Sequence, residues 1–291
     1  MYELVQLSQH DYYIESPTKI GLVRLNDTEV CLIDGGSDKD AGRKVRQVLD
    51  ANGWRLRAIY NTHCHADHIG GNKYLQSQTG CAVYLPEIEC DFARHPILEP
   101  SLLYGGFPPQ ELHHKFLLAQ ASDARELTPE ALPAGFEVVE LPGHFFRMVG
   151  FRTPDDTLFL ADCLSSRRTL DKYQISFLYD VAGYLDTPER VRGMTAKAFV
   201  PAHADATQEI APLAQYNIDK VHEIAQLIVD LCRTPLTFEE ILQKLFAHYD
   251  LTMTFEQYAL VGSTVRSYLS WLKETGRLKV EIAEHMLRFH S

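Results

Sequence analysis

Residues 61–72 read NTHCHADHIGGN, and six consecutive positions of this stretch hold four side chains that can bind a metal: His63, His65, Asp67 and His68. Imidazole and carboxylate groups suit zinc, iron and manganese. A single buried histidine is usually a hydrogen-bonded core residue. Three histidines and an aspartate this close together need another explanation, because buried polar and charged groups require partners. We therefore interpret the stretch as part of a metal site.

The spacing within this stretch favours two neighbouring metal sites over one. His63 and His65 are two residues apart at the end of a predicted strand, so their side chains point the same way. Asp67 and His68 are adjacent, at the start of the following helix, and point elsewhere. The glycine pair at 70–71 suits a tight strand-to-helix turn with close backbone approach.

Three further candidate ligands stand where apolar strands end. His144 follows Leu-Pro-Gly, Asp162 ends the run Phe159–Asp162, and His203 follows Phe-Val-Pro-Ala. Each is weak evidence alone. Together with the first stretch they form a set of seven, which we expect at one edge of a β-sandwich.

The hydrophobic pattern predicts an α/β domain over residues 1–214. Alternating and apolar runs predict strands at 2–7, 19–25, 29–33, 56–61, 136–141, 149–152, 157–161 and 198–201, with helices at 38–52 and about 188–196. The region from about 87 to 134 is rich in proline and aromatic residues and has no sustained period. We interpret it as a partly helical insertion that covers a site.

In residues 215–291 the hydrophobic residues recur at helical spacing, unlike in the preceding region, and this change predicts a small C-terminal domain. Helices are expected at 218–232, 237–249 and 255–275, followed by a hairpin at 277–280 and 285–289. Three helices and a two-stranded wing are typical of a winged-helix module. The longest predicted helix has no basic cluster, so we favour a packing or dimerisation role over DNA binding.

Composition and charge indicate which kinds of partner and which cellular compartment to expect. The net charge is −11, and the chain has no long run of lysine and arginine, which argues against a nucleic acid partner. No stretch is apolar enough to span a membrane, and the first residues do not resemble a signal peptide. None of the six cysteines forms a C-x-x-C pair. We therefore expect a cytoplasmic protein with free thiols.

The set of seven resembles the metallo-β-lactamase superfamily, whose hallmark is H-x-H-x-D-H followed by a histidine, an aspartate and a histidine at later strand ends. The resemblance covers about residues 18–210. It implies an αββα sandwich with a buried supporting aspartate, here Asp34. It further implies one metal on His63, His65 and His144, a second on Asp67, His68 and His203, and Asp162 as the bridge. Two divalent ions are expected, zinc first, with iron or manganese as alternatives.

Several branches of the superfamily remain open. Glyoxalase II resembles the chain in its Thr-His-x-His-x-Asp-His motif and in the Gly-Gly-Asn that follows. Persulfide dioxygenases, which use one iron, resemble it over Asn61–His68, but their Gly-Cys-Gly-Arg-Thr-Asp segment is replaced here by Ser165–Leu170. A phosphodiesterase or ribonuclease of the same fold is a further alternative. True lactamase activity is disfavoured, because the adjacent Cys163 points to the opposite strand face from Asp162.

The resulting hypothesis is a dinuclear hydrolase that uses a metal-held hydroxide to cleave a small ester, thioester or lactone. Asp67 is expected both to bind a metal and to orient the nucleophile. The proton donor to the leaving group stays open among Tyr104, Tyr173, Tyr179 and Tyr184.

His144 departs from its relatives in being followed by Phe145-Phe146-Arg147, which predicts a bulky rim with a cation beside the metals. The apolar, proline-rich stretch His95–Phe116 is expected to form the facing pocket wall. A homodimer contact is the alternative for this stretch.

Overall fold

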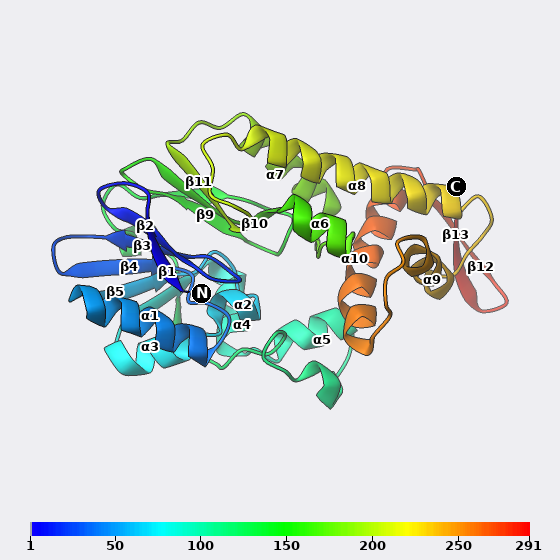
Figure 1. Cartoon of the computed structure of the whole chain (residues 1–291). Coiled ribbons are helices and arrows are strands. Elements are labelled where there is room, and N and C mark those ends of the chain that lie inside the picture. Colours follow the sequence, from blue (N-terminus) through cyan, green and yellow to red (C-terminus); the bar gives the residue numbers. More distant parts are fainter. Residues whose placement is uncertain (1) are drawn as a thin grey trace.

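Two β-sheets lie face to face in the computed structural model, which describes residues 2–291 (Figure 1). Within this range the first sheet has seven strands that are neighbours in chain order: β1 (Glu3–Gln6), β2 (Asp11–Glu15), β3 (Ile20–Arg24), β4 (Glu29–Ile33), β5 (Arg55–Tyr60), β6 (Ala82–Leu85) and β7 (Ala124–Glu126). Its first four strands pair antiparallel, and β4 to β7 pair parallel. The second sheet has the order β11 (Ala198–His203), β10 (Thr157–Ser165), β9 (Val149–Arg152) and β8 (Glu137–Glu140).

Helices cover the outer face of each sheet (Figure 1). Those on the first sheet are α1 (Lys39–Asn52), α3 (Asn72–Thr79) and α4 (Glu87–Arg94), and those on the second are α7 (Val181–Arg192) and the start of α8 (Ala211–Leu231). Two shorter helices, α2 (Ala66–Ile69) and α6 (Arg167–Tyr173), follow sheet edges. The predicted αββα sandwich is therefore confirmed.

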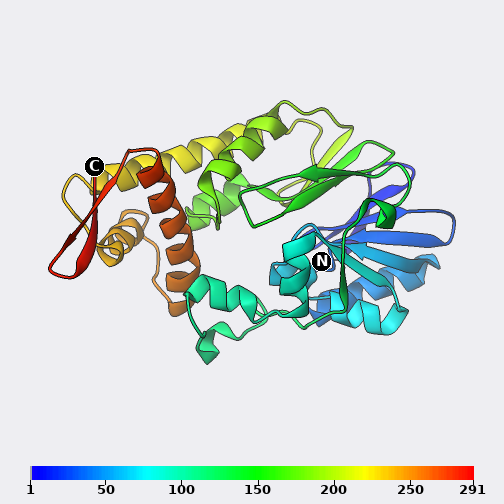
Figure 2. The same cartoon turned by 180° about the vertical axis from the view of Figure 1, so that it is seen from behind.

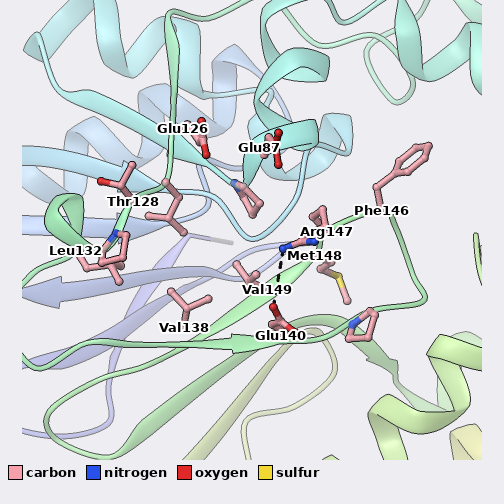
Figure 3. A pocket seen from close by; sticks show the side chains of 14 residues that line it. Glu87, Glu126, Thr128, Leu132, Val138, Glu140, Phe146, Arg147, Met148 and Val149 are labelled. Atoms are coloured by element: carbon pink, nitrogen blue, oxygen red, sulfur yellow. Dashed lines mark ion pairs between the residues drawn. The ribbon is translucent and has the colours of Figure 1, made fainter.

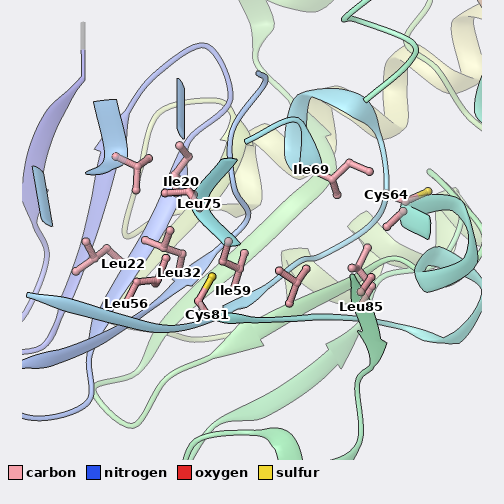
Figure 4. Packing of buried hydrophobic residues seen from close by; sticks show 14 of the residues in the cluster. Ile20, Leu22, Leu32, Leu56, Ile59, Cys64, Ile69, Leu75, Cys81 and Leu85 are labelled. Carbon is pink, nitrogen blue, oxygen red and sulfur yellow. The ribbon is translucent and has the colours of Figure 1, made fainter. Parts of the chain in front are cut away.

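Separate apolar layers hold the sandwich together. Between the sheets, Cys31 and Tyr60 of the first pack against Phe151 and Phe159 of the second. Outside the first sheet, a larger cluster joins its strands to α1 and α3, as the packing of Ile20, Leu32, Ile59 and Leu75 shows (Figure 4). Strands whose residues are almost all apolar must be covered on both faces of the sheet, and these two layers cover them.

Helix α1 illustrates how local sequence sets these elements. Asp38 has extended backbone and accepts a hydrogen bond from the Ala41 N–H at 2.8 Å, which caps the helix start. Val45 and Leu49 face the core, and Gly53 ends the helix in the left-handed region at φ 68°. The helix begins one residue from where the sequence predicts it.

Among the differences between the sequence prediction and the structure, two have a local cause. Strand β2 was missed, although its residues are buried, because the run Asp11–Glu15 opens and closes with acidic residues. The helix expected from Pro188 begins at Val181 instead, since the Asp180 side chain accepts from the Ala182 N–H and caps it there. Pro188 lies inside α7, although proline is best accommodated in the first turn.

The insertion is partly helical, as expected. Besides α4 it contains α5 (Leu98–Tyr104), η1 (Gln110–Leu112) and η2 (Pro129–Ala131). Helix α5 accepts Pro100 within its first turn, where a missing N–H costs nothing. Seen from behind, α5 lies against α10 (Phe255–Glu274) of the C-terminal region (Figure 2), and Leu103 packs there against Ala259.

The C-terminal region consists of most of α8, then α9 (Phe238–His248), α10 and the hairpin β12 (Lys279–Ala283) and β13 (Met286–His290). Its own apolar cluster includes Ile228, Leu245 and Tyr268. Helix α8 runs across the boundary expected at residue 214, so a separate winged-helix-like domain remains a prediction. No helix within residues 2–291 combines the length and the apolarity needed to cross a bilayer. All six cysteines are free thiols, as predicted, and all are buried.

Candidate metal centre

The seven candidate ligands converge on one edge of the sandwich. Strand β5 leads into His63 and His65, and α2 carries Asp67 and His68. The other three come from the second half of the sandwich: His144 from the loop between β8 and β9, Asp162 from β10 and His203 from the end of β11.

The ligand atoms fall into two groups. His63, His65, His144 and Asp162 offer donor atoms that all lie within 4.8 Å of one another. A second set with the same property contains Asp67, His68, His203 and again Asp162. These groups coincide with the two ligand sets implied by the family resemblance. We call His63, His65 and His144 the three-histidine group, and Asp67, His68 and His203 the mixed group.

Asp162 belongs to both groups because its Oδ2 lies near histidines of each, while its Oδ1 faces His68 of the mixed group. Its Oδ1 lies 3.1 Å from Nε2 of His68, and its Oδ2 lies 3.2 Å from Nε2 of His203 and 3.5 Å from Nε2 of His144. This is the arrangement a bridging carboxylate needs. Ligation itself remains a prediction for all seven residues.

The donor set fits divalent metal ions. Nε2 of His63, Nε2 of His68 and Oδ1 of Asp162 are buried and make no hydrogen bond of good geometry within residues 2–291, although the last two atoms lie 3.1 Å apart. Buried polar atoms without partners are costly, so several in one cluster indicate that another group satisfies them. Imidazole nitrogens and carboxylate oxygens at these separations suit zinc, iron or manganese.

In three of the candidate imidazoles, the ring nitrogen that faces away from the centre lies at hydrogen-bond distance from a neighbouring oxygen. Nδ1 of His68 lies 2.8 Å from Oδ2 of Asp34, Nδ1 of His144 lies 3.1 Å from the Phe177 carbonyl, and Nδ1 of His203 lies 3.2 Å from the Pro17 carbonyl. An N–H donated to such an oxygen leaves Nε2 as a lone-pair donor toward the centre, the usual arrangement around metal-binding histidines.

Asp34 is placed as the sequence predicts, buried behind the first motif. Its carboxylate accepts the Thr62 N–H at 2.8 Å and the Thr62 hydroxyl at 2.9 Å, besides the contact to His68. The glycine pair allows this turn, since a Cβ on Gly71 would lie 2.1 Å from the Gly35 carbonyl oxygen. The predicted close backbone approach is therefore confirmed.

The three-histidine group is electrostatically suited to neutral imidazoles. Burial and the neighbouring histidines lower the pKa of His63 well below its usual value. Burial, then His144, lowers the pKa of His65 to about 3, and burial likewise lowers the pKa of His144. Neutral imidazoles carry the free lone pair that a metal requires.

The mixed group behaves in the opposite way. Burial opposes a charge on His203, but Asp162 and Asp67 raise its pKa to about 10. Burial also opposes a charge on His68, whereas the surrounding aspartates raise the pKa of His68 well above its usual value. Among the protein groups alone, protons on His68 and His203 therefore balance the aspartates.

The surroundings of His144 differ in part from the sequence prediction. Phe145 is buried with its ring centroid 4.5 Å from that of His65, so an aromatic side chain does stand beside the three-histidine group. Arg147 was expected at this rim, which is wrong: its guanidinium lies 3.9 Å from Glu140.

Arg147 and Phe146 instead line a separate pocket of about 400 Å³ behind the loop (Figure 3). Glu87, Glu126 and Glu140 also line it, and none of the seven candidate ligands does. This pocket is therefore distinct from the metal centre.

Sequence reasoning missed several residues near the centre. The Thr18 hydroxyl donates to Oδ2 of Asp67 at 2.7 Å, and Asn61 donates to the His68 carbonyl at 3.1 Å. Phe177 and two buried carboxylic residues of the insertion, Glu89 and Glu99, also lie close. No local pattern marks any of them, because their contacts come from distant segments.

Of the four tyrosines considered as proton donors, one is excluded. The Tyr184 hydroxyl is buried and donates to Asn217.

Comparison with known families adds to this geometry. A family described as the metallo-beta-lactamase superfamily matches residues 14–203, which contain all seven candidate ligands. The chain belongs to the metallo-beta-lactamase superfamily.

Two relatives within this superfamily carry the name hydroxyacylglutathione hydrolase. The protein from Methylococcus capsulatus is 37% identical over 121 residues, which cover 41% of this chain and 38% of the relative. That from Rhodospirillum rubrum is 27% identical over 164 residues, or 54% of each chain. The matches thus span about half of these relatives or less.

Solved structures of the superfamily share the fold over nearly the whole chain. A metallo-beta-lactamase family protein from Thermus thermophilus aligns with a TM-score of 0.74 at 18% identity, covering 98% of this chain and 99% of that one. A beta-lactamase domain protein from Burkholderia ambifaria aligns with a TM-score of 0.72 at 17% identity, covering 99% and 93%. The superfamily fold and the C-terminal region therefore occur together in other proteins.

The first prediction concerns His144→Ala. The variant should lose the metal of the three-histidine group, so metal content should fall from about two equivalents to about one. The thermal midpoint of the metal-free protein should change by only a few degrees, because His144 lies at the sheet edge. Elemental analysis and calorimetry measure both, with the exposed His222→Ala as control. Full metal content in His144→Ala would contradict the assignment.

The second prediction concerns proton release. Because His203 and His68 have raised pKa values in the protein alone, metal must displace protons from them at neutral pH. Metal affinity should therefore rise with pH, and binding near pH 7 should release at least one proton per chain. Titration calorimetry in buffers of different ionisation enthalpy measures this number. A value of zero would show that these imidazoles are already neutral.

Proposed function

We propose that this chain is a hydrolase that holds two divalent ions and cleaves small esters or thioesters. The observation that carries the proposal is the position of Asp162, whose carboxylate takes part in both candidate ligand groups. A carboxylate shared by both groups would let each group hold an ion, as in dinuclear hydrolases. Zinc is the first candidate, and iron and manganese suit the same donors.

Bound divalent ions supply Lewis-acid activation of water and of the scissile carbonyl. The chain's own contribution is to fix the geometry. Oδ2 of Asp67 accepts from the Thr18 hydroxyl and lies 3.1 Å from Nε2 of His203, so its orientation is restrained from two sides. Asp67 is therefore our candidate both for binding a metal and for orienting the attacking water.

The surroundings of the three-histidine group favour an apolar acyl part. The half-buried Phe177 ring lies 5.2 Å from that of His65 and 5.6 Å from that of His144. It is backed by the buried Phe145 ring at 6.2 Å. An apolar wall beside the reacting centre favours substrates with matching apolar surface.

The other side of the centre favours a polar leaving group. His203 contributes to a groove of about 610 Å³ that is also lined by Lys19, Arg167 and Arg168. Acidic residues line the same groove, so both signs of charge are present. Such a lining suits a charged, peptide-like leaving group better than an apolar one.

Thioesters are the first substrates to test, because the relatives carry the name hydroxyacylglutathione hydrolase. The metal-loaded protein should be assayed against S-acyl glutathiones, a simple alkyl thioester, a lactone and an aryl phosphodiester. We expect the highest kcat/KM for the glutathione thioesters and no activity in the Asp162→Ala variant.

Glutathione persulfide with an oxygen electrode tests the dioxygenase alternative. Oxygen consumption without thioester cleavage would replace the hydrolase proposal, and preferential cleavage of the phosphodiester would favour the phosphodiesterase alternative.

The third prediction is that Phe177→Ala lowers kcat/KM about tenfold for long acyl chains, with little change for acetyl thioesters. The loss reflects apolar contact worth roughly 1–3 kcal/mol. The backbone carbonyl that accepts from His144 is kept in the variant. Phe107→Ala, at an 83% exposed position, serves as control. Equal losses on short and long acyl chains would contradict this wall.

A further inference from the structure

Helix α4 carries a carboxylate that the proposed reaction does not use. Glu89 is fully buried, and its two oxygens accept different backbone N–H groups. Oε2 accepts from Cys64 at 3.1 Å, and Oε1 accepts from Arg147 at 2.8 Å.

These two donors belong to the two loops that supply the three-histidine group. Cys64 stands between His63 and His65, and Arg147 follows His144 by three residues. The loops are about 80 residues apart in sequence, and Nε2 of His144 lies 3.0 Å from Nδ1 of His65. A single carboxylate therefore joins the loops close to where their histidines meet.

The carboxylate bonds to the backbone and not to a cation. The Arg147 side chain reaches toward Glu140 on the other side of the loop (Figure 3). No lysine, arginine or histidine within residues 2–291 forms an ion pair with Glu89. Its two hydrogen bonds therefore compensate its burial.

This burial has an energetic cost that simple packing does not explain. Burial raises the pKa of Glu89, while the Cys64 thiol and the N–H groups of Arg147 and Cys64 lower it. An apolar side chain of similar size would fill the space without a desolvation penalty. Glutamine in the same position would turn its NH2 group toward one of the two N–H donors, so one of these hydrogen bonds would be lost. Two acceptor oxygens are the property that distinguishes glutamate here.

A second buried carboxyl points to the same turn. Glu99 of α5 is 5% exposed, and burial, then Asp67 and Glu89, raise its pKa, whereas His68 and the Ala66 N–H lower it. Cys64 and Ala66 flank His65. The insertion thus brings acidic side chains to the backbone on either side of one candidate ligand.

We propose that Glu89 is a positioning residue that sets the distance between the His63–His65 turn and the His144 loop. Through that distance it controls metal affinity at the three-histidine group. The inference rests on the proposed function, because it requires the three-histidine group to bind a metal. It assigns to the insertion a role in supporting the centre.

The test is Co²⁺ titration of the metal-free full-length chain, followed by the visible absorption of bound Co²⁺. Glu89→Gln should weaken one of two Co²⁺ equivalents by about 10- to 100-fold and leave the other nearly unchanged. The absorption of the weakened site should also change, because its geometry is altered. Glu87→Gln, an exposed position in the first turn of α4, is the matched control.

Glu89→Asp keeps both oxygens on a side chain one methylene shorter, and it is the second variant if Glu89→Gln does not fold. The affinity of Glu89→Asp for the weakened Co²⁺ equivalent should lie between the affinities of wild type and Glu89→Gln. If Glu89→Asp is the only variant that folds, its affinity should be measurably lower than that of wild type. Wild-type affinity and spectrum in a folded Glu89 variant would overturn the inference. If the wild-type chain bound no Co²⁺ at all, the proposed function would fail and this inference with it.

Discussion

The carboxylate of Asp34 is the contact on which the geometry of the centre depends. It lies at the end of β4 at φ 66°, a backbone conformation that is uncommon outside glycine. From there it accepts the Thr62 N–H and contacts Nδ1 of His68. One side chain thus fixes both the start of the ligand turn and the ring orientation of its last histidine. A bound metal needs this order, because an imidazole must present the correct nitrogen.

Much of the centre could be predicted from the sequence because most of its ligands stand at or beyond strand ends; Asp162 differs, since β10 continues past it to Ser165. Parallel pairing of β4 with β5, and of β10 with β11, brings the ends of these strands to the same edge. A histidine or aspartate near these strand ends therefore lies close to the others. The pattern at 63–68, together with His144, Asp162 and His203, contains enough information to place them.

The supporting residues could not be predicted in this way, because their roles depend on distant contacts. Glu89 lies in the segment EIEC, which reads as the exposed start of an ordinary helix. Phe177 stands in a loop and has no periodic signal. Arg147 has the residue type expected near a substrate, yet the chain turns after Phe145 and directs it to Glu140. Residue type and spacing do not determine which way a loop turns.

Contacts of the loop 175–180 show that the C-terminal region is part of the same structure as the centre. Ile175 and Leu178 pack into the apolar cluster of the C-terminal helices, and the Leu178 N–H donates to the Thr264 hydroxyl of α10 at 3.3 Å. Between them, the Phe177 carbonyl accepts from His144. Tyr179 donates its N–H to the Gly143 carbonyl at 3.0 Å. A candidate metal ligand is therefore held from behind by a loop that the C-terminal helices anchor. The C-terminal helices and the candidate ligand His144 thus contact the same loop.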